Sequence, residues 1–145
     1  MEIKFIAVLS VITKQPDASA SLYQETLGLP LERFEMTGYR FMDEFPGSRH
    51  FGVWPLEMAA QSCFGQDEWP ASIPEPTATI DFELADAKAV ESAVQEMKAK
   101  GQDFIHEVKM EPWGQTVARF ISPEGVLISL SYAPWLHKKD QKLSP

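Results

Sequence analysis

Histidine, cysteine and carboxylate side chains are the groups of this sequence that could perform acid–base, nucleophilic or metal chemistry. The 145 residues include three histidines and one cysteine, at His50, His106, His137 and Cys63. A single cysteine excludes an intramolecular disulfide and a zinc site made of several thiolates. No Cys–His–acid signature surrounds Cys63, so we expect a buried thiol that is not a nucleophile.

His50 is the candidate catalytic residue, because it lies in a strand-like segment that we expect to border a cleft. A general base needs a positioned partner within hydrogen-bond reach, and spacing alone does not reveal one. His106 shares one predicted strand face with Phe104, Val108 and Met110, which favours a hydrogen-bonded structural role. His137 lies in the Lys-rich sequence HKKDQK, and we expect it in solvent.

The acids with the clearest placement lie in residues 77–84, TATIDFEL. Apolar and polar residues alternate strictly there, which predicts a half-buried strand with Thr79, Asp81 and Glu83 on one face. Asp86 then caps a predicted helix whose apolar residues recur at helical spacing, and Gly101 ends it.

The N-terminal half repeats this strand–helix pattern about 70 residues earlier, and three strand-like segments follow each copy. The sequence therefore predicts an α+β fold with two tandem βαβββ modules in one domain, residues 1–135. We assign residues 1–65 to the first module with a short helix, 66–76 to a linker, 77–135 to the second module and 136–145 to a polar tail.

The double βαβββ layout resembles the vicinal oxygen chelate superfamily, which includes glyoxalase I, extradiol dioxygenases, fosfomycin-resistance enzymes and bleomycin-resistance proteins. The resemblance covers residues 3–132. It is carried by S-x-x-[FL]-Y-x-x-x-L-G at Ser19–Gly28, by Glu111-Pro112-Trp113-Gly114 and by the late turn Ser122-Pro123-Glu124-Gly125. It implies an open half-barrel with the helices outside, a ligand cleft on the concave face, and a homodimer.

Alternation predicts which strand residues face this cleft. The expected set is Lys4, Ile6, Val8 and Ser10; His50, Gly52 and Trp54; Thr77, Thr79, Asp81 and Glu83; and Leu127, Ser129 and Ser131. In metal-binding relatives, four such positions carry His, Gln or Glu. The resemblance places those positions at or near Val8, Trp54, Thr79 and Ser129. Because these side chains are poor metal ligands, we expect neither the usual metal site nor a cofactor.

Further candidate ligand-binding residues lie around the seventh predicted strand. Trp113 either forms a wall of the cleft or packs against another module or subunit. Gln115 and Arg119 follow, and Arg119 either pairs with an acid such as Asp81 or anchors a ligand.

These observations favour a metal-independent binder of a small cationic or aromatic compound. The alternative is a glyoxalase-like isomerase or lyase acting on a small carbonyl compound. It would use an atypical metal held by His50, Glu57 or Asp81, or no metal and a histidine base. A third possibility is a purely interacting fold anchored by Trp135.

The formal net charge of −8 disfavours nucleic-acid binding. No apolar run is long enough for a membrane helix. Ala18-Ser19-Ala20 looks like a cleavage site, but no positive charge excess precedes it, so we expect no signal peptide and a cytoplasmic protein.

Overall fold

The computed structural model describes residues 1–137, the side chain of Glu44 excepted. The first half contains β1 (Phe5–Thr13), α1 (Pro16–Ser21), η1 (Leu22–Thr26), β2 (Glu32–Arg33), β3 (Arg40–Phe45), β4 (Ser48–Pro55) and α2 (Leu56–Phe64). The second half contains β5 (Ala78–Glu83), α3 (Ala87–Ala99), β6 (Lys109–Met110), β7 (Thr116–Ile121) and β8 (Leu127–Tyr132).

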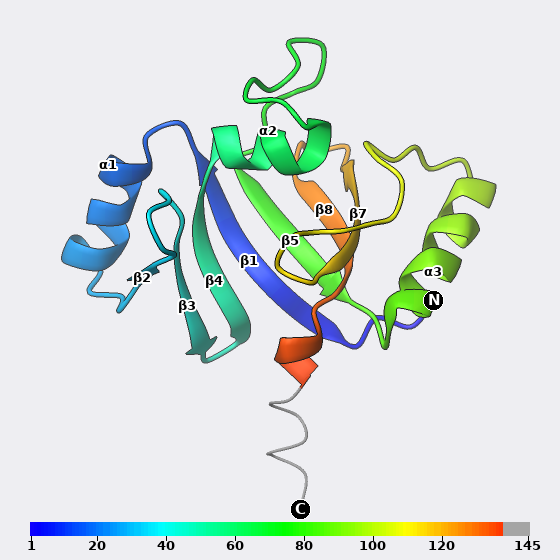
Figure 1. Ribbon diagram of the computed structural model, residues 1–145, viewed down its shortest axis with the longest axis horizontal. Coiled ribbons are helices and arrows are strands. Elements are labelled where there is room, and N and C mark those ends of the chain that lie inside the picture. Colours follow the sequence, from blue (N-terminus) through cyan, green and yellow to red (C-terminus); the bar gives the residue numbers. More distant parts are fainter. Residues whose placement is uncertain (138–145) are drawn as a thin grey trace, which may run out of the picture.

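All eight strands form one open sheet in the order β2-β3-β4-β1-β5-β8-β7-β6. In each half the first strand lies parallel to the last, and the antiparallel pairing of β1 with β5 joins the halves. Figure 1 shows α1 and α3 flanking the sheet on opposite sides. The predicted α+β fold of two βαβββ modules with an open sheet is therefore confirmed.

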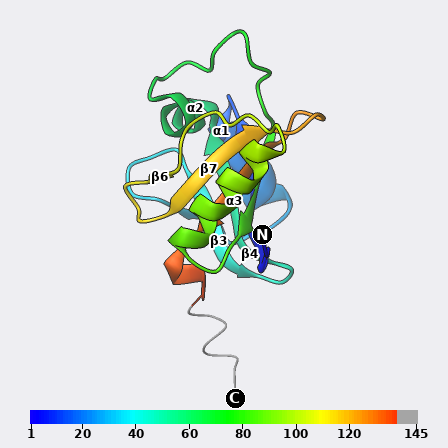
Figure 2. The same ribbon diagram turned by 90° about the vertical axis from the view of Figure 1, so that its right-hand side faces the viewer.

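The helices form where the sequence provides caps and apolar stripes. The side chain of Asp86 accepts a hydrogen bond from the backbone N–H of Ala89, which starts α3. Val90 and Val94 then pack against the outward face of β8 at Leu130. Figure 2 shows α3 lying along β7. No helix in the described part of the chain is long and apolar enough to cross a membrane.

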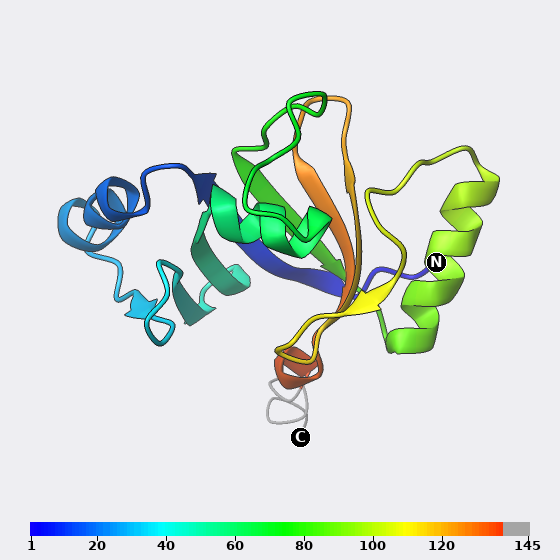
Figure 3. The same cartoon turned by 45° about the horizontal axis from the view of Figure 1, so that its top comes forward.

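The short helix α2 covers one end of the concave face. Its small residues Ala59, Ala60 and Cys63 pack against Ile12 of β1 and Leu127 of β8. Figure 3 shows α2 crossing the end of the central strands. Because α2 fills this end with apolar side chains, the open part of the concave face lies farther along the strands.

A single helical turn at residues 134–137 follows β8 at the other end of the sheet (Figure 1). Leu136 is buried against Ala7 and Ala133. His137 Nε2 lies 2.7 Å from Oε2 of Glu83, a side chain with no exposed surface. The expectation that Leu136 and His137 belong to a solvated tail was wrong, because a buried carboxylate at the end of β5 binds this turn. Residues 138–145 of the expected tail lie outside the described residues.

A β-bulge in β1 changes which of its residues face the cleft. The pairing of β1 with β5 shifts in register between Ile6 and Val8. Val8 and Ser10 face the concave side as expected. Ile6 is instead 47% exposed on the other side, and Lys4 precedes the strand and pairs with Glu2. The prediction that Lys4 and Ile6 face the cleft was wrong, because the extra residue of a bulge interrupts strict alternation.

Candidate functional site

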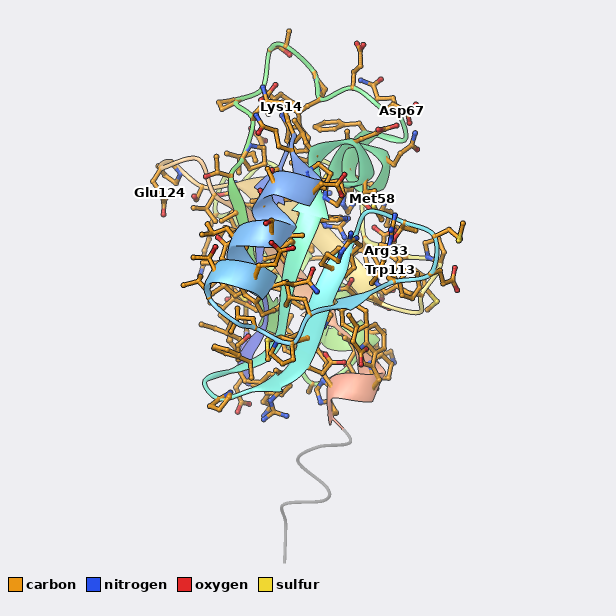
Figure 4. The ribbon with its side chains drawn as sticks, turned by 90° about the vertical axis from the view of Figure 1, so that its left-hand side faces the viewer. Lys14, Arg33, Met58, Asp67, Trp113 and Glu124 are labelled. Carbon is orange, nitrogen blue, oxygen red and sulfur yellow. The ribbon has the colours of Figure 1, made fainter. Side chains whose placement is uncertain are left out.

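The concave face of the sheet encloses a cavity of about 340 Å³ between the two modules. Its floor comes from β1, β4, β5 and β7, and α2 closes one end with Met58. Figure 4 shows Met58 and Trp113 on one side of the molecule, with Glu124 on the opposite side. Three of the four tryptophans line the cavity, namely Trp54, Trp113 and Trp135. Phe34, Tyr39 and Phe41 complete an aromatic enclosure.

Asp81 provides a carboxylate in the floor and is only 7% exposed. Its Oδ2 accepts a hydrogen bond of 3.0 Å from Nε2 of Gln115, which also donates to Ser131 Oγ. The amide oxygen of Gln115 accepts a hydrogen bond from Trp113 Nε1 at 2.9 Å. Thr79 Oγ1 lies 3.4 Å from the other Asp81 oxygen. The hydrogen bonds through Gln115 thus fix the indole of Trp113 in relation to the Asp81 carboxylate. Among the described residues no cation forms an ion pair with Asp81.

Arg119 lines the same cavity but pairs with an acid that the sequence did not single out. Its Nη1 donates to Glu111 Oε1 at 2.7 Å, and both side chains are buried. Its guanidinium lies 5.6 Å from the ring centroid of Trp54. Of the two expected roles, the structure shows pairing with an internal acid. The acid is Glu111 and not Asp81, because the turn before β7 returns Glu111 to Arg119.

His106 supports Arg119. Its Nδ1 donates to the carbonyl oxygen of Glu107, which leaves Nε2 as an acceptor 3.3 Å from Arg119 Nη1. Burial, with Arg119 nearby, lowers the pKa of His106 and keeps the ring neutral. This arrangement agrees with the structural role expected for His106.

His50 lies on the opposite wall in a chain of hydrogen bonds. Its Nδ1 is 2.7 Å from Asp43 Oδ1, and its Nε2 is 2.5 Å from the hydroxyl oxygen of Tyr39. Tyr39 also hydrogen-bonds to Ser10 of β1, and burial raises its pKa above the usual value. Neither Tyr39 nor Asp43 was among the site residues expected from the sequence.

One feature of the sequence indicated the hydrogen bonds among Asp43, His50 and Tyr39, namely a glycine inside a predicted strand. A Cβ atom at Gly52 would lie 2.7 Å from Ser10 Oγ and even closer to the Tyr39 hydroxyl. A glycine in a strand often marks the close approach of another group. Here Gly52 leaves room for the phenol of Tyr39 to cross β4 and reach β1.

The four positions at which the family resemblance places metal ligands do not form a metal-binding set. Val8 and Trp54 offer no ligand atom, and Thr79 is hydrogen-bonded to Asp81. Ser129 has no exposed surface, and its Oγ has no hydrogen-bond partner among the described residues. No group of three or more His, Cys, Asp or Glu side chains that could hold a metal occurs within residues 1–137, Glu44 apart. The residues present therefore do not fit the family's metal.

Cys63 is buried in α2. Burial raises the pKa of its thiol to about 11, so the side chain stays protonated at neutral pH. The thiol accordingly packs in the apolar cluster under α2 and is not activated as a nucleophile.

The fold and the cleft define a class of protein in which two βαβββ modules share one curved sheet around a ligand site. The model of the Glyoxalase/Bleomycin resistance protein/Dioxygenase superfamily matches residues 5–130, and the chain belongs to this superfamily. No curated protein sequence matches the chain at a significant level.

Solved structures share the fold at low sequence identity. A glyoxalase/bleomycin resistance protein/dioxygenase superfamily member from Vibrio splendidus 12B01 is 11% identical, with a TM-score of 0.58 over 91% of this chain and 100% of that chain. A variant of methylmalonyl-CoA epimerase from Streptomyces coelicolor, in complex with 2-nitronate-propionyl-CoA, is 17% identical, with a TM-score of 0.55 over 93% and 98%. A structure described as NAD-dependent benzaldehyde dehydrogenase from Legionella pneumophila is 12% identical, with a TM-score of 0.58 over 86% and 96%.

Proposed function

We propose that this protein binds a small planar aromatic compound with a cationic hydrogen-bond donor, and that it does so without a metal ion. The observation that carries this proposal is Asp81. A carboxylate removed from water is costly unless a charge partner compensates it. Gln115 and Thr79 occupy part of the acceptor capacity of Asp81, and a ligand cation would complete it.

The walls of the cavity support an aromatic ligand. Ligand sites are mostly apolar clefts of roughly 300–1,000 Å³ with a few convergent polar groups, and this cavity of about 340 Å³ is at the small end. Trp113 is 46% exposed and is held by Gln115, so its face is available for stacking. An aromatic face also attracts cations. The cleft therefore suits a compound of one or two rings.

The side chains at the four positions described above support metal independence. An isomerase with an atypical divalent ion would need ligands from Asp81, His50 and Glu57. These residues do not form a cluster that could hold a metal ion, and His50 is already hydrogen-bonded to Asp43 and Tyr39.

The homodimer and the cytoplasmic location expected from the sequence stay predictions.

Titration of tryptophan fluorescence with naphthamidine and with naphthamide tests the proposal, because these compounds have nearly the same shape and differ in charge. We expect the amidine to quench and to bind at least about tenfold more tightly, since an amidinium pairs bidentately with a carboxylate. Asp81→Asn should remove this preference, whereas Asp103→Asn, which removes the same charge from an exposed position, should keep it.

A second variant tests the aromatic wall. Trp113→Ala should weaken binding of both compounds, because both stack on the same indole. Equal affinity for amidine and amide in the wild type would overturn the role of Asp81. Absence of binding by both compounds would overturn the proposed ligand class.

A further inference from the structure

The wall opposite Asp81 contains three polar side chains in the order that activates a nucleophile or base in hydrolytic enzymes. Asp43 contacts His50 Nδ1 at 2.7 Å, and His50 Nε2 contacts the Tyr39 hydroxyl at 2.5 Å. All three residues line the cavity. An acid that orients a histidine, which in turn contacts a hydroxyl group, is the general logic of a catalytic triad.

The direction of each hydrogen bond follows from its partners. A carboxylate accepts only, so His50 carries its proton on Nδ1 and donates it to Asp43. Nε2 is then a free acceptor, and the Tyr39 O–H donates to it. The rings of Tyr39 and His50 are stacked, within 11° of parallel and with centroids 5.9 Å apart. Phe41 stacks on both rings, at centroid distances of 5.9 and 5.3 Å, and restricts their movement.

The tyrosine hydroxyl is also placed toward the centre of the cleft. Gly52 leaves the space through which it reaches Ser10 on β1. Ser10 pairs with Thr79 of β5, and Val8 pairs with Asp81. Asp81 is therefore a diagonal neighbour of Ser10 across the strand pair, a separation of about 7–8 Å. One small ligand can reach both the carboxylate and the phenol.

We propose that Tyr39, His50 and Asp43 form a metal-free proton-transfer site that removes and returns a proton at a carbon next to a carbonyl group of the bound compound. The inference rests on the proposed function in that the compound must first bind in this cleft. Its substrate class is an aryl ketone with a cationic group for Asp81.

The step conserves atoms and charge. As the substrate C–H bond breaks, its electron pair forms the double bond of an enolate, and the proton passes to the oxygen of Tyr39. The phenol proton passes at the same time to His50 Nε2, and Asp43 stabilises the resulting imidazolium. Reversal returns a proton to carbon. Because burial raises the pKa of Tyr39, the resting side chain is a phenol, and its oxygen is a strong base once the proton has moved to His50.

Deuterium exchange into the acetyl group of para-acetylbenzamidine, followed by proton NMR in D2O, tests the proposal. We expect the wild type to exchange this methyl group at least about tenfold faster than buffer, since positioned acid–base groups contribute roughly 10²–10⁴-fold. Tyr39→Phe and His50→Gln should return the rate to that of buffer. Tyr23→Phe, the same change on a tyrosine that packs against Phe51 outside the cavity, should keep the wild-type rate.

Fluorescence quenching by the same compound separates the two proposals. The proton-transfer site would be supported if the compound quenches the fluorescence of both the wild type and Tyr39→Phe, but only the wild type accelerates its deuterium exchange. Quenching without faster exchange, or equal exchange by Tyr39→Phe, would overturn that site and leave the binding function standing. No quenching by the wild type would overturn both.

Imidazole NMR provides a measurement without any ligand. The nitrogen-15 spectrum of the wild type should show His50 protonated on Nδ1, and Tyr39→Phe should shift the Nε2 resonance. A proton on Nε2 alone would overturn the proposed order of donors and acceptors.

Discussion

Ser129 and Ser131 lie two positions apart on β8, and neither has any exposed surface. Ser131 Oγ accepts a hydrogen bond from Gln115 at 2.8 Å, whereas Ser129 Oγ has no partner among the described residues. A buried hydroxyl without a partner loses its hydration and gains nothing in return. The two serines therefore differ in their effect on stability although their burial is the same.

We expect Ser129→Ala to raise the free energy of unfolding by up to about 1 kcal/mol and Ser131→Ala to lower it by about 1 kcal/mol. Urea denaturation at neutral pH measures both. The family resemblance places a metal-ligand position at Ser129. If a metal ion stabilised the wild type and Ser129→Ala removed this stabilisation, the result would contradict our account of the site.

The buried ion pair of Glu111 and Arg119 shows that a buried charge, like a buried hydroxyl, destabilises the protein when it lacks a partner. Removing one partner of a buried ion pair typically costs about 3–5 kcal/mol, because the other charge is left uncompensated. Arg119 is thus a structural member of the cavity wall. Its charge is compensated by Glu111, whereas no cation of the described residues pairs with Asp81.

At the scale of elements, the crossing of β4 by Tyr39 depends on Gly52. Ser10 and the Tyr39 ring occupy the space that a methyl group at this position would need. Both belong to ordered strands or their ends, so neither can withdraw without losing its hydrogen bond. Gly52 therefore couples the conformation of β4 to the chain of Asp43, His50 and Tyr39.

Gly52→Ala should lower the free energy of unfolding by about 1–3 kcal/mol, the usual cost of overpacking. The double variant Gly52→Ala/Tyr39→Phe should recover part of this loss, because the nearest clashing atom is the phenol oxygen. Denaturation of the wild type, both single variants and the double variant completes a double-mutant cycle. Strict additivity of the two changes would show that the glycine does not serve Tyr39.

At the scale of the whole molecule, the Glu83 carboxylate joins the end of β5 to the last described turn. It accepts hydrogen bonds from the backbone N–H of Ala133 and from His137. This turn carries Trp135 and Leu136, which line the cavity. Burial is the largest influence on Glu83 and raises its pKa, against the opposing effect of these hydrogen bonds.

This shift predicts a pH dependence. A group whose pKa is raised by folding binds its proton more tightly in the folded state, so its contribution to stability is complete below the unfolded pKa of 4.5. The contribution decreases as the pH rises through the higher folded pKa. We expect the unfolding free energy of wild type minus that of Glu83→Gln to fall as the pH is raised from about 4 upwards, measured by urea denaturation at each pH. A difference that grows with pH would contradict the raised pKa.

Much of the fold was predictable because it depends on local patterns. The alternation in residues 77–84 predicted β5, and the cap at Asp86 predicted the start of α3. Alternation in the segment that contains His50 and Trp54 correctly placed both residues on the cavity side of β4. It was wrong for Lys4 and Ile6, because a bulge depends on how β1 fits β5 and leaves no clear pattern within β1 itself.

The candidate site was predictable as a set of positions, but its interactions were not. Asp81, Gln115 and Arg119 line the cavity as expected, and Trp113 takes the wall position that was one of its two expected roles. Ser129, expected at the same site, is fully buried and is not among the residues that line the cavity. The pairing of Arg119 with Glu111 and the contact of His50 with Tyr39 depend on turns that bring separate strands together. Burial of His137 likewise depends on a carboxylate 54 residues earlier in the chain.

The sequence by itself therefore determined the two βαβββ modules and the superfamily. These follow from residue type and from the period of a strand or helix, which covalent geometry sets locally. The tertiary structure alone decided which charges are compensated. Within the described part of the chain, it leaves Asp81 facing the cleft without a cation and joins Tyr39, His50 and Asp43 on the other wall. Such contacts also depend on the turns that fix strand register and on packing between distant segments, neither of which the periodicity of one segment shows.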